Sequence, residues 1–472
     1  MPSVRSKAVA AVLAAVILAV LATLVHGPWK GTRLATGPDG DTQRVASTAM
    51  APPVLAPVSG DPAGATPTDA GIQAVLGPLM KATALGAPPA VAVVDALTGR
   101  ALFGANQERA ATPASTTKIT TAVAALTAPG PDHRIATRVV PGATPGTIVL
   151  VGGGDPTLTA LDGRQYGGRY QPARLSDLAV ATVAALKAAG TTQVRLQYDT
   201  TLYTGPAVHP IGAGNENIAP VVSLMADEGR VDPSIVGKEA DRVQTPGADA
   251  AKKFAAMLKS SGITVEGAPA AGTAPAGGAP ELASVQSPPV SAMVEQMLTV
   301  SDNDMAEALL RQVAIAKGQP ASFQGGTVAS RQVLEGLGVT YGASDLKDGS
   351  GLDKDDRLTP QTLVQTLTLA ASPKHPELRW ALTGLPIAGF TGTLADRYGQ
   401  SSGAADAAGV VRAKTGSLTG VSTLSGLVRD RDGRLLAFAI LADRFTGDPG
   451  PARAAIDRMA SALAGCGCGT AG

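Results

Sequence analysis

Cysteine is almost absent from this sequence, and recognisable metal-ligand patterns are absent with it. The two cysteines, Cys466 and Cys468, both lie in the C-terminal stretch "AGCGCGTAG". A metal site needs more ligands than this stretch supplies, and the scattered histidines have no ligand spacing. The histidines are His26, His133, His209 and His375. We therefore predict no metal and no other cofactor. In an exported protein the two thiols could oxidise, but a ring closed across one glycine would be strained, and we interpret them as part of a non-catalytic tail.

Aromatic residues and an excess of either charge are also missing. Aromatic side chains make up 3% of the chain against 44% hydrophobic residues in total, so the core must be built from Ala, Val, Leu and Ile. The 39 basic and 38 acidic residues nearly cancel, and no long basic run occurs, which argues against a nucleic-acid partner. A chain of 472 residues is too long to fold around one ordinary hydrophobic core, so we predict two or three domains.

The N-terminus carries an uncharged, largely apolar run, 8–25, preceded by Arg5 and Lys7. This length is at the lower limit for a bilayer-spanning helix, and the positive flank would keep the N-terminus in the cytoplasm. No small-x-small cleavage site follows, so we predict that residues 1–26 are an uncleaved membrane anchor, with a cleaved signal peptide as the alternative. Residues 27–69, rich in Pro, Gly, Ala and Thr, are predicted to be a flexible linker. The rest of the chain is then extracytoplasmic.

Sequence patterns at both ends of the remaining chain predict one sheet covered by helices. A helix-like run, 71–85, precedes the hairpin "PAVAVVDA"–"RALFGAN", and an Ala-rich helix, "TPASTTKITTAVAAL", follows. Near the C-terminus, "GVVRAKTGSL", "VSTLSGLVRD" and "RLLAFAILAD" are typical of three consecutive strands, and a final helix is predicted over 451–463. Strands at both ends with a helix-rich middle predict an α+β fold with an antiparallel sheet.

Three short motifs follow one another along the chain. Ser115 and Lys118 lie three residues apart, so one helical turn brings the amine back toward the hydroxyl. Alone, such a pair is usually a serine beside a solvated lysine. The segment Ser301–Asn303 begins a predicted helix, where Ser and Asn are common as caps, and Lys414–Gly416 lies in a predicted strand. Each motif is weak by itself, but the three in this order are a strong signal.

The order Ser-x-x-Lys, Ser-Asp-Asn, Lys-Thr-Gly is the signature of penicillin-binding proteins and serine β-lactamases. Over residues 71–463 the chain resembles the class C low-molecular-mass penicillin-binding proteins, which are D-Ala-D-Ala carboxypeptidases and endopeptidases of the peptidase S13 type. The resemblance extends to "VGGGDPTL", "DGSGL", "LPIAGFTGTL", "SDNDMAEALLR" and "AKTGSLTG". One departure is Asp353, where a small hydroxyl residue is expected, and it leaves local substrate contacts open.

The long interval between the first two motifs predicts an insertion within the catalytic domain, as the resemblance also implies. The interval has its own strand-like runs, "GTIVLVGG" and "TQVRLQYD", and a helix-like run, "GADAAKKFAAMLKSSG". Within it, "GGGDPTL" favours a tight turn over a phosphate cradle, because no helix with Lys-Ser/Thr follows. The predicted organisation is a penicillin-binding-protein/β-lactamase-like transpeptidase domain over 70–130 and 288–464, one or two accessory domains over 131–287, and a tail over 465–472.

The resemblance also implies a role for each motif residue. Ser115 is a poor nucleophile until its proton is removed, and no well-supported His–Asp pair is present to remove it. A lysine can act as the base if burial and a nearby cation lower its pKa, and the resemblance implies Lys118 as the base with Lys414 as the cation. The resemblance further implies that Ser301 relays a proton and that Asn303 contacts the substrate amide and the amine of Lys118. Lys414, Thr415 and Ser417, around Gly416, would bind the substrate carboxylate. The N–H groups of Ser115 and Ser417 would form the oxyanion hole.

These residues predict a serine-type D-Ala-D-Ala carboxypeptidase acting on peptidoglycan stem peptides, with β-lactams acylating the same serine. Endopeptidase action uses the same acylation step and stays open. A β-lactamase is one alternative, but no Glu-x-x-Leu-Asn lies between the second and third motifs, where Glu307, Glu335 and Glu377 have other contexts. A catalytically inactive wall-binding protein is another, and the complete motif set argues against it.

Overall fold

The structure is a computed structural model that describes residues 65–162, 167–235, 239–278 and 280–469. All of them belong to one of two compact units, 60–472. The predicted membrane segment, 1–26, and most of the predicted linker lie outside the described residues. In the part of the chain that is described, no helix combines the length and the apolar composition needed to cross a bilayer.

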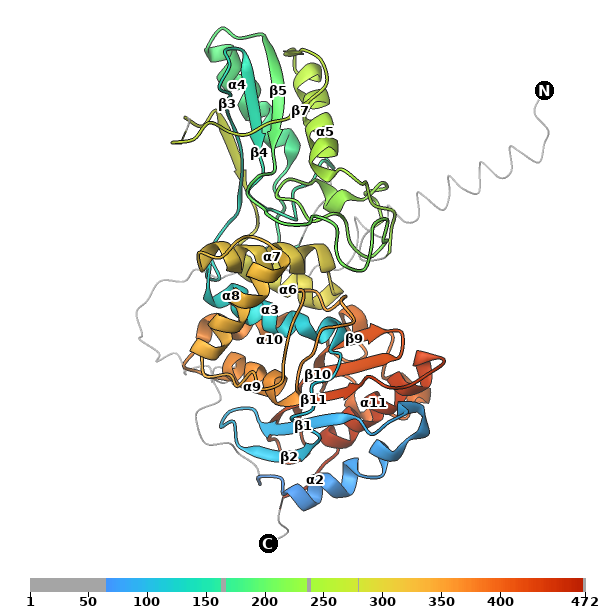
Figure 1. The fold of residues 1–472 in the computed structure, drawn as a ribbon. Coiled ribbons are helices and arrows are strands. Elements are labelled where there is room, and N and C mark those ends of the chain that lie inside the picture. Colours follow the sequence, from blue (N-terminus) through green and yellow to red (C-terminus); the bar gives the residue numbers. More distant parts are fainter. Residues whose placement is uncertain (1–64, 163–166, 236–238, 279, 470–472) are drawn as a thin grey trace, which may run out of the picture. The chain divides into compact units, whose positions relative to one another are not determined.

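The main sheet has five antiparallel strands in the order β2–β1–β11–β10–β9 (Figure 1). Its strands are β1 (Ala90–Asp95), β2 (Ala101–Ala105), β9 (Arg412–Leu418), β10 (Val421–Arg429) and β11 (Leu435–Ala442). Strand β1 pairs with β11, so segments from opposite ends of the sequence meet in the centre of the sheet. The predicted antiparallel sheet and its C-terminal strands are confirmed, and β9, which carries the third motif, is an edge strand.

Helices cover both faces of this sheet, and strand β11 shows why its sequence is apolar throughout. Phe438 and Ile440 lie in a core shared with α2 and α11, whereas Ala439 and Leu441 lie in a core shared with α9. Because successive side chains of a strand point to opposite faces, a central strand between two cores needs apolar residues at every position. The covering helices are α2 (Asp69–Leu76), α9 (Pro360–Ala371) and α11 (Pro449–Ala464).

A helical layer adjoins the sheet and holds the first two motifs. Its helices are α3 (Lys118–Thr127), α6 (Val290–Val300), α7 (Asn303–Ala316), α8 (Phe323–Gly336) and α10 (Trp380–Thr383). They share a core dominated by Ala, Val, Leu and Met, as the scarcity of aromatic residues requires. A 3₁₀ turn, Ala114–Thr117, precedes α3 and contacts β9 and β10, so the first motif lies between the helical layer and the sheet edge.

A second sheet lies in the segment between the first two motifs. Its strand order is β6–β5–β4–β3–β8, with β7 also paired to β5; β4, β5 and β6 run parallel and the pairs of β3 are antiparallel. The elements are β3 (Ala136–Pro141), β4 (Thr147–Val151), α4 (Leu175–Ala188), β5 (Gln193–Asp199), α5 (Pro246–Ser260), β6 (Thr264–Val265), β7 (Ala270–Ala271) and β8 (Ala283–Gln286). They enclose a separate core with α4 and α5. The inserted-domain boundaries at 131 and 287 stay a prediction.

The "GGGDPTL" segment follows β4 and is a turn whose amides are already used. The N–H groups of Gly152 and Gly154 donate to the backbone oxygens of Asp199 and Ser223 at 3.1 and 2.7 Å. These amides are therefore not free to cradle a phosphate, in agreement with our interpretation as a tight turn.

Both ends of the folded region differ from expectation. The predicted helix over 71–85 stops early: α2 ends at Leu76, and two short 3₁₀ turns follow, because the ring of Pro78 blocks continuation of the helix. Residues 465–469 of the predicted tail are part of the fold, since Cys466 is buried beside α11 and is joined to Cys468 by a disulfide. The Thr68 N–H donates to the Cys468 carbonyl at 3.0 Å, so the end of the predicted linker pairs with that tail.

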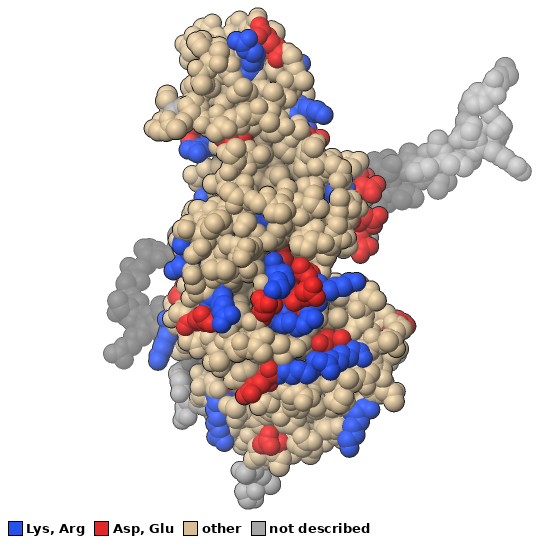
Figure 2. All heavy atoms as spheres, viewed as in Figure 1, with Lys and Arg blue, Asp and Glu red and all other residues tan. Residues whose placement is uncertain are grey.

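The surface agrees with the balanced charge of the sequence. On the face drawn in Figure 2, acidic and basic side chains of the described residues are intermixed, and neither sign forms an extended area.

Candidate active site

The first motif forms a direct contact between hydroxyl and amine. Lys118 is fully buried, and its Nζ donates to Ser115 Oγ at 3.0 Å. It also donates to Asn303 Oδ1 and to the carbonyl oxygen of Ser350, both at 2.7 Å. Three partners account for the three protons of an ammonium group, so every donor position of this buried lysine is used.

The turn around Ser115 is tightly enclosed by two glycines from distant segments. Ala114 has a left-handed φ of 47°, and a side chain at Gly351 or Gly416 would collide with the Pro113–Ala114 backbone. Only glycine permits this approach of the sheet edge and of the "DGSGL" turn, and Gly351 itself has a φ of 81°. Ser115 is therefore held from both sides. We expected it inside the first turn of an α-helix; the structure places it in the 3₁₀ turn, and α3 begins only at Lys118.

The second motif is a sharp junction between α6 and α7. Ser301 ends α6 in the left-handed region, with φ 64°. Asp302 caps α7 by accepting from the N–H of Met305 at 2.8 Å. Asn303 is the first residue of α7, and its Nδ2 donates to the carbonyl of Asn217 at 3.0 Å. A serine in this conformation is uncommon outside constrained sites, and here it turns the chain so that Ser301 and Asn303 both reach the cleft.

The third motif lies on the edge strand β9. Lys414 is fully buried, and its Nζ donates to Ser301 Oγ at 2.8 Å and to the Thr415 carbonyl at 2.9 Å. The N–H of Ala413 points away from β10, because it donates to Pro386 at 2.9 Å. Backbone amides alternate sides along a strand, so the N–H of Ser417 also points away from β10, toward the open edge.

Burial lowers the pKa of both lysines. It lowers the pKa of Lys118 to about 8, against the opposing effect of nearby carboxylates, of which Asp348 is the strongest. It also holds the pKa of Lys414 well below its usual value, with further lowering from the positive charges of Lys118 and Arg397. We expected burial and the nearby Lys414 together to depress the pKa of Lys118. Burial is the main cause in the structure, and the positive charge of Lys118 adds to the lowering of the Lys414 pKa.

The motif residues open onto a cavity of about 710 Å³. Its wall includes Ser115, Ser301, Asn303, Thr415 and Ser417. The lining also contains residues that sequence reasoning missed, namely Asn217, Arg230, Glu239, Arg242, Leu352, Thr393, Arg397 and Arg453. Four of these come from the segment between the first two motifs. Leu352 and Thr393 belong to the "DGSGL" and "LPIAGFTGTL" segments of the resemblance, but for the other six residues no local pattern in the sequence indicates a place in the site.

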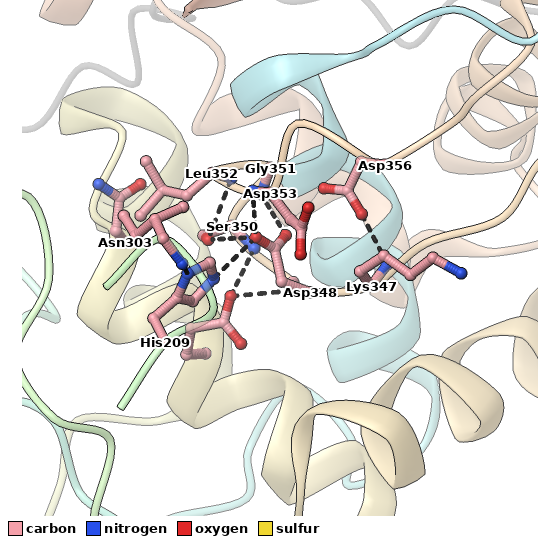
Figure 3. Close-up of polar contacts among 12 residues, drawn as sticks. His209, Asn303, Lys347, Asp348, Ser350, Gly351, Leu352, Asp353 and Asp356 are labelled. Carbon is pink, nitrogen blue, oxygen red and sulfur yellow. Dashed lines mark hydrogen bonds and ion pairs between the residues drawn. The ribbon is translucent and has the colours of Figure 1, made fainter. Parts of the chain in front are cut away.

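The "DGSGL" segment, 348–352, forms a turn (Figure 3), and the carbonyl oxygen of Ser350 in this turn accepts from Lys118 Nζ. Asp348 accepts from the N–H groups of Gly351 and Asp353 at 2.6 and 2.8 Å. Glu307 Oε1 accepts from the N–H of Ser350 at 2.9 Å. Hydrogen bonds, chiefly from His209, lower the pKa of Asp348 to about 2 although burial opposes them. From the sequence we noted only that Glu307 does not belong to a Glu-x-x-Leu-Asn element; in the structure it supports this turn.

Two acidic clusters in the described residues have the spacing of metal ligands. They are His209–Glu307–Asp348 and Glu228–Asp302–Asp304. Their carboxylates already accept from backbone amides or pair with arginine; Asp304, for example, contacts Arg242 at 3.0 Å and the Ala219 N–H at 2.9 Å. Both clusters are therefore satisfied hydrogen-bond networks, and we assign no metal to either.

A serine hydroxyl bound by a buried lysine, beside a second serine–lysine contact at the edge of an antiparallel sheet, defines a serine acyltransferase of the penicillin-binding class. The chain belongs to the D-Ala-D-Ala carboxypeptidase 3 (S13) family, whose model matches residues 73–241 and 236–464. The resemblance inferred from the motifs is thereby confirmed.

Named relatives and solved structures agree with this assignment. A carboxypeptidase of Mycobacterium tuberculosis is 37% identical over 415 residues, which are 86% of this chain and 86% of the relative. Carboxypeptidase DacB of Mycolicibacterium smegmatis is 37% identical over 468 residues, which are 96% of this chain and 97% of the relative. Penicillin binding protein 4 of Haemophilus influenzae has the same fold, with a TM-score of 0.66 at 24% identity, covering 82% of this chain and 97% of that one.

Proposed function

We propose that this protein is a serine-type D-alanyl-D-alanine carboxypeptidase that acts on peptidoglycan stem peptides through an acyl-enzyme at Ser115. The 3.0 Å contact between Lys118 Nζ and Ser115 Oγ carries the proposal. With its pKa lowered to about 8, Lys118 is partly neutral near physiological pH and has a lone pair for the serine proton.

Acylation begins when Ser115 Oγ attacks the carbonyl carbon of the penultimate D-Ala and its proton passes to Lys118 Nζ. The carbonyl oxygen becomes an oxyanion, which the N–H groups of Ser115 and Ser417 stabilise; loss of one such donor typically costs about 3 kcal/mol. The outward direction of the Ser417 N–H supports this role. As the intermediate collapses, the amide bond breaks and the proton on Lys118 passes through Ser301 to the leaving amine, which returns Lys118 to its neutral form.

Recognition of the substrate carboxylate is assigned to Lys414, Thr415 and Ser417. Two of these, Thr415 and Ser417, line the cavity, and Thr415 Oγ1 is positioned by Thr393 Oγ1 at 2.8 Å. Asn303, which bridges Lys118 and the Asn217 carbonyl, orients the amine and contacts the substrate amide. Water then attacks the ester carbonyl with Lys118 as base, which releases the shortened peptide and frees Ser115.

β-Lactams are expected to acylate the same serine, because their strained amide and carboxylate mimic the D-Ala-D-Ala terminus. A structure of penicillin binding protein 4 of Haemophilus influenzae contains a β-lactam, and this chain is 25% identical to it with a TM-score of 0.59. We propose that the enzyme works outside the cytoplasm, where its proposed substrate lies, and that the apolar N-terminal run attaches it to the membrane. Cleavage of peptide cross-links by the same acylation is a second proposed activity.

The decisive experiment incubates the protein and a Ser115→Ala variant with a fluorescent penicillin and, separately, with purified muropeptides. We expect long-lived labelling of the wild type alone, and mass analysis should show loss of one D-Ala from pentapeptides. Loss of cross-linked dimers would add the endopeptidase activity. Rapid hydrolysis of the penicillin without D-Ala release would instead identify a β-lactamase. A wild-type protein that is not labelled by the penicillin and releases no D-Ala would support the alternative of an inactive wall-binding protein.

A further inference from the structure

The orientation of the Lys118 amine depends on two acceptors besides Ser115. As a neutral base, Lys118 has two N–H bonds and one lone pair. Asn303 Oδ1 and the Ser350 carbonyl, each 2.7 Å from Nζ, can take the two N–H bonds and leave the lone pair directed at Ser115 Oγ. The position of the Ser350 carbonyl therefore helps to decide whether the amine can remove the serine proton.

The Ser350 carbonyl is held by the turn that begins at Asp348. Asp348 is fully buried, and its carboxylate accepts from the N–H groups of Gly351 and Asp353, one on each oxygen. Its Oδ2 also accepts from the Ser350 hydroxyl at 3.3 Å. Rotation of this carboxylate would break these bonds together and move the Ser350 backbone.

One side chain from the segment between the first two motifs holds the Asp348 carboxylate in place. His209 is 2% exposed, and its Nε2 lies 2.9 Å from Asp348 Oδ2 (Figure 3). Its Nδ1 accepts from the N–H of Ile211 at 3.2 Å, so the ring proton is on Nε2 and is donated to Asp348. Phe323 packs edge-on against the imidazole, with ring centroids 5.1 Å apart.

We propose that His209 is a positioning residue for Lys118: by binding Asp348 it holds the turn that presents the Ser350 carbonyl to the lysine amine. The segment between the first two motifs thereby contributes to catalysis through a contact that does not touch the substrate. The proposal rests on the proposed role of Lys118 as the base.

The surroundings of His209 distinguish this role from that of an ordinary buried histidine. The charged groups around it are Asp348 and Asp353 of the turn, and Glu307 on α7 with its partner Arg311. Glu307 is directed at the Gly349 and Ser350 amides, so His209 and Glu307 support the same turn from different elements. Loss of His209 removes one support and leaves the other.

The test compares three variants with the wild type. His209→Leu removes the donor and retains bulk, whereas His209→Gln retains an N–H near the position of Nε2. Gln312→Leu is the matched control. Gln312 Nε2 donates to the Gly153 carbonyl at 2.9 Å, so this residue also links α7 to the segment between the first two motifs. Neither Gln312 nor Gly153 belongs to the turn that begins at Asp348. Each protein is assayed for penicillin acylation over a range of concentrations and pH, and for thermal unfolding.

We expect His209→Leu to lower the maximal acylation rate by about ten- to a hundredfold, with little change in the half-saturating concentration, because misplacement of a reacting group acts on the rate. His209→Gln should restore the maximal acylation rate to within about threefold of the wild-type rate, and Gln312→Leu should stay within about twofold of it. The pH at half-maximal rate should not move, because the carboxylates around Lys118 remain.

Near-normal maximal acylation by folded His209→Leu would overturn the proposal, as would an equal loss in the Gln variant or in the control. A wild type that is not acylated would overturn the proposed function instead. Should His209→Leu fail to fold, nitrogen NMR of the wild type still decides. A proton on His209 Nδ1 rather than Nε2 would leave Asp348 without this donor and refute the inference.

Discussion

Acylation of Ser115 should depend steeply on pH, because only the neutral form of Lys118 can take the serine proton. Burial lowers the pKa of Lys118 to about 8. Below that value the amine is protonated and has no lone pair, so the rate should rise with pH and level off once the amine is neutral.

The size of the effect follows from the pKa. For a group that titrates at about 8, the neutral fraction is about one hundredth at pH 6 and about one half at pH 8. The acylation rate should therefore increase about fiftyfold over this interval and no more than about twofold beyond it. Lys118→Arg should show no such rise and should acylate several orders of magnitude more slowly, since a guanidinium stays protonated at any working pH.

The assay is stopped-flow or quenched labelling with a penicillin whose carboxylate stays ionised throughout, at subsaturating concentration, between pH 5.5 and about 9.5. Circular dichroism at each pH confirms that the fold is intact. A flat profile, or near-normal acylation by folded Lys118→Arg, would refute the assignment of Lys118 as the base and would direct the search to another group.

Three further predictions test other parts of the site and chain. Lys414→Ala should reduce the acylation rate strongly, and Lys414→Arg should reduce it less. The pH at half-maximal rate should stay near about 8 in both variants, because burial rather than Lys414 sets the pKa of Lys118. An upward shift of that pH in Lys414→Ala would show that the charge of Lys414 does lower the pKa of Lys118. Gly416→Ala should slow acylation at least about tenfold and lower the melting temperature, because the added methyl would overlap Thr423 Oγ1 and the Pro113 carbonyl; unchanged kinetics would show that the turn yields easily. The full-length protein should sediment with membranes and resist carbonate extraction, whereas a chain beginning at residue 65 should be soluble and equally active; a native mature N-terminus after His26 would favour a cleaved signal.

Several features were predictable from the sequence because local chemistry specifies them. Ser115 and Lys118 are three residues apart, so any helical turn brings hydroxyl and amine together. The C-terminal strands were predictable from apolar runs bounded by turn residues, and the helix after Asp302 from the polar residues at its start, although the cap is Asp302 and not Ser301 or Asn303. The end of α2 was predictable as well, from Pro78, but our prediction followed the apolar pattern past this proline to Leu85.

The sequence by itself determined which residues we assign as the nucleophile, the amine and the carboxylate-binding strand, because motif order and spacing are properties of the chain. Tertiary structure alone decided how they work. His209, Glu307 and Asp348 are far apart in sequence, and they become a support for Lys118 only when three segments pack together. The lowered pKa of Lys118 has the same origin: it comes from exclusion of water by surrounding atoms, which depends on packing and not on the residues adjacent to the lysine.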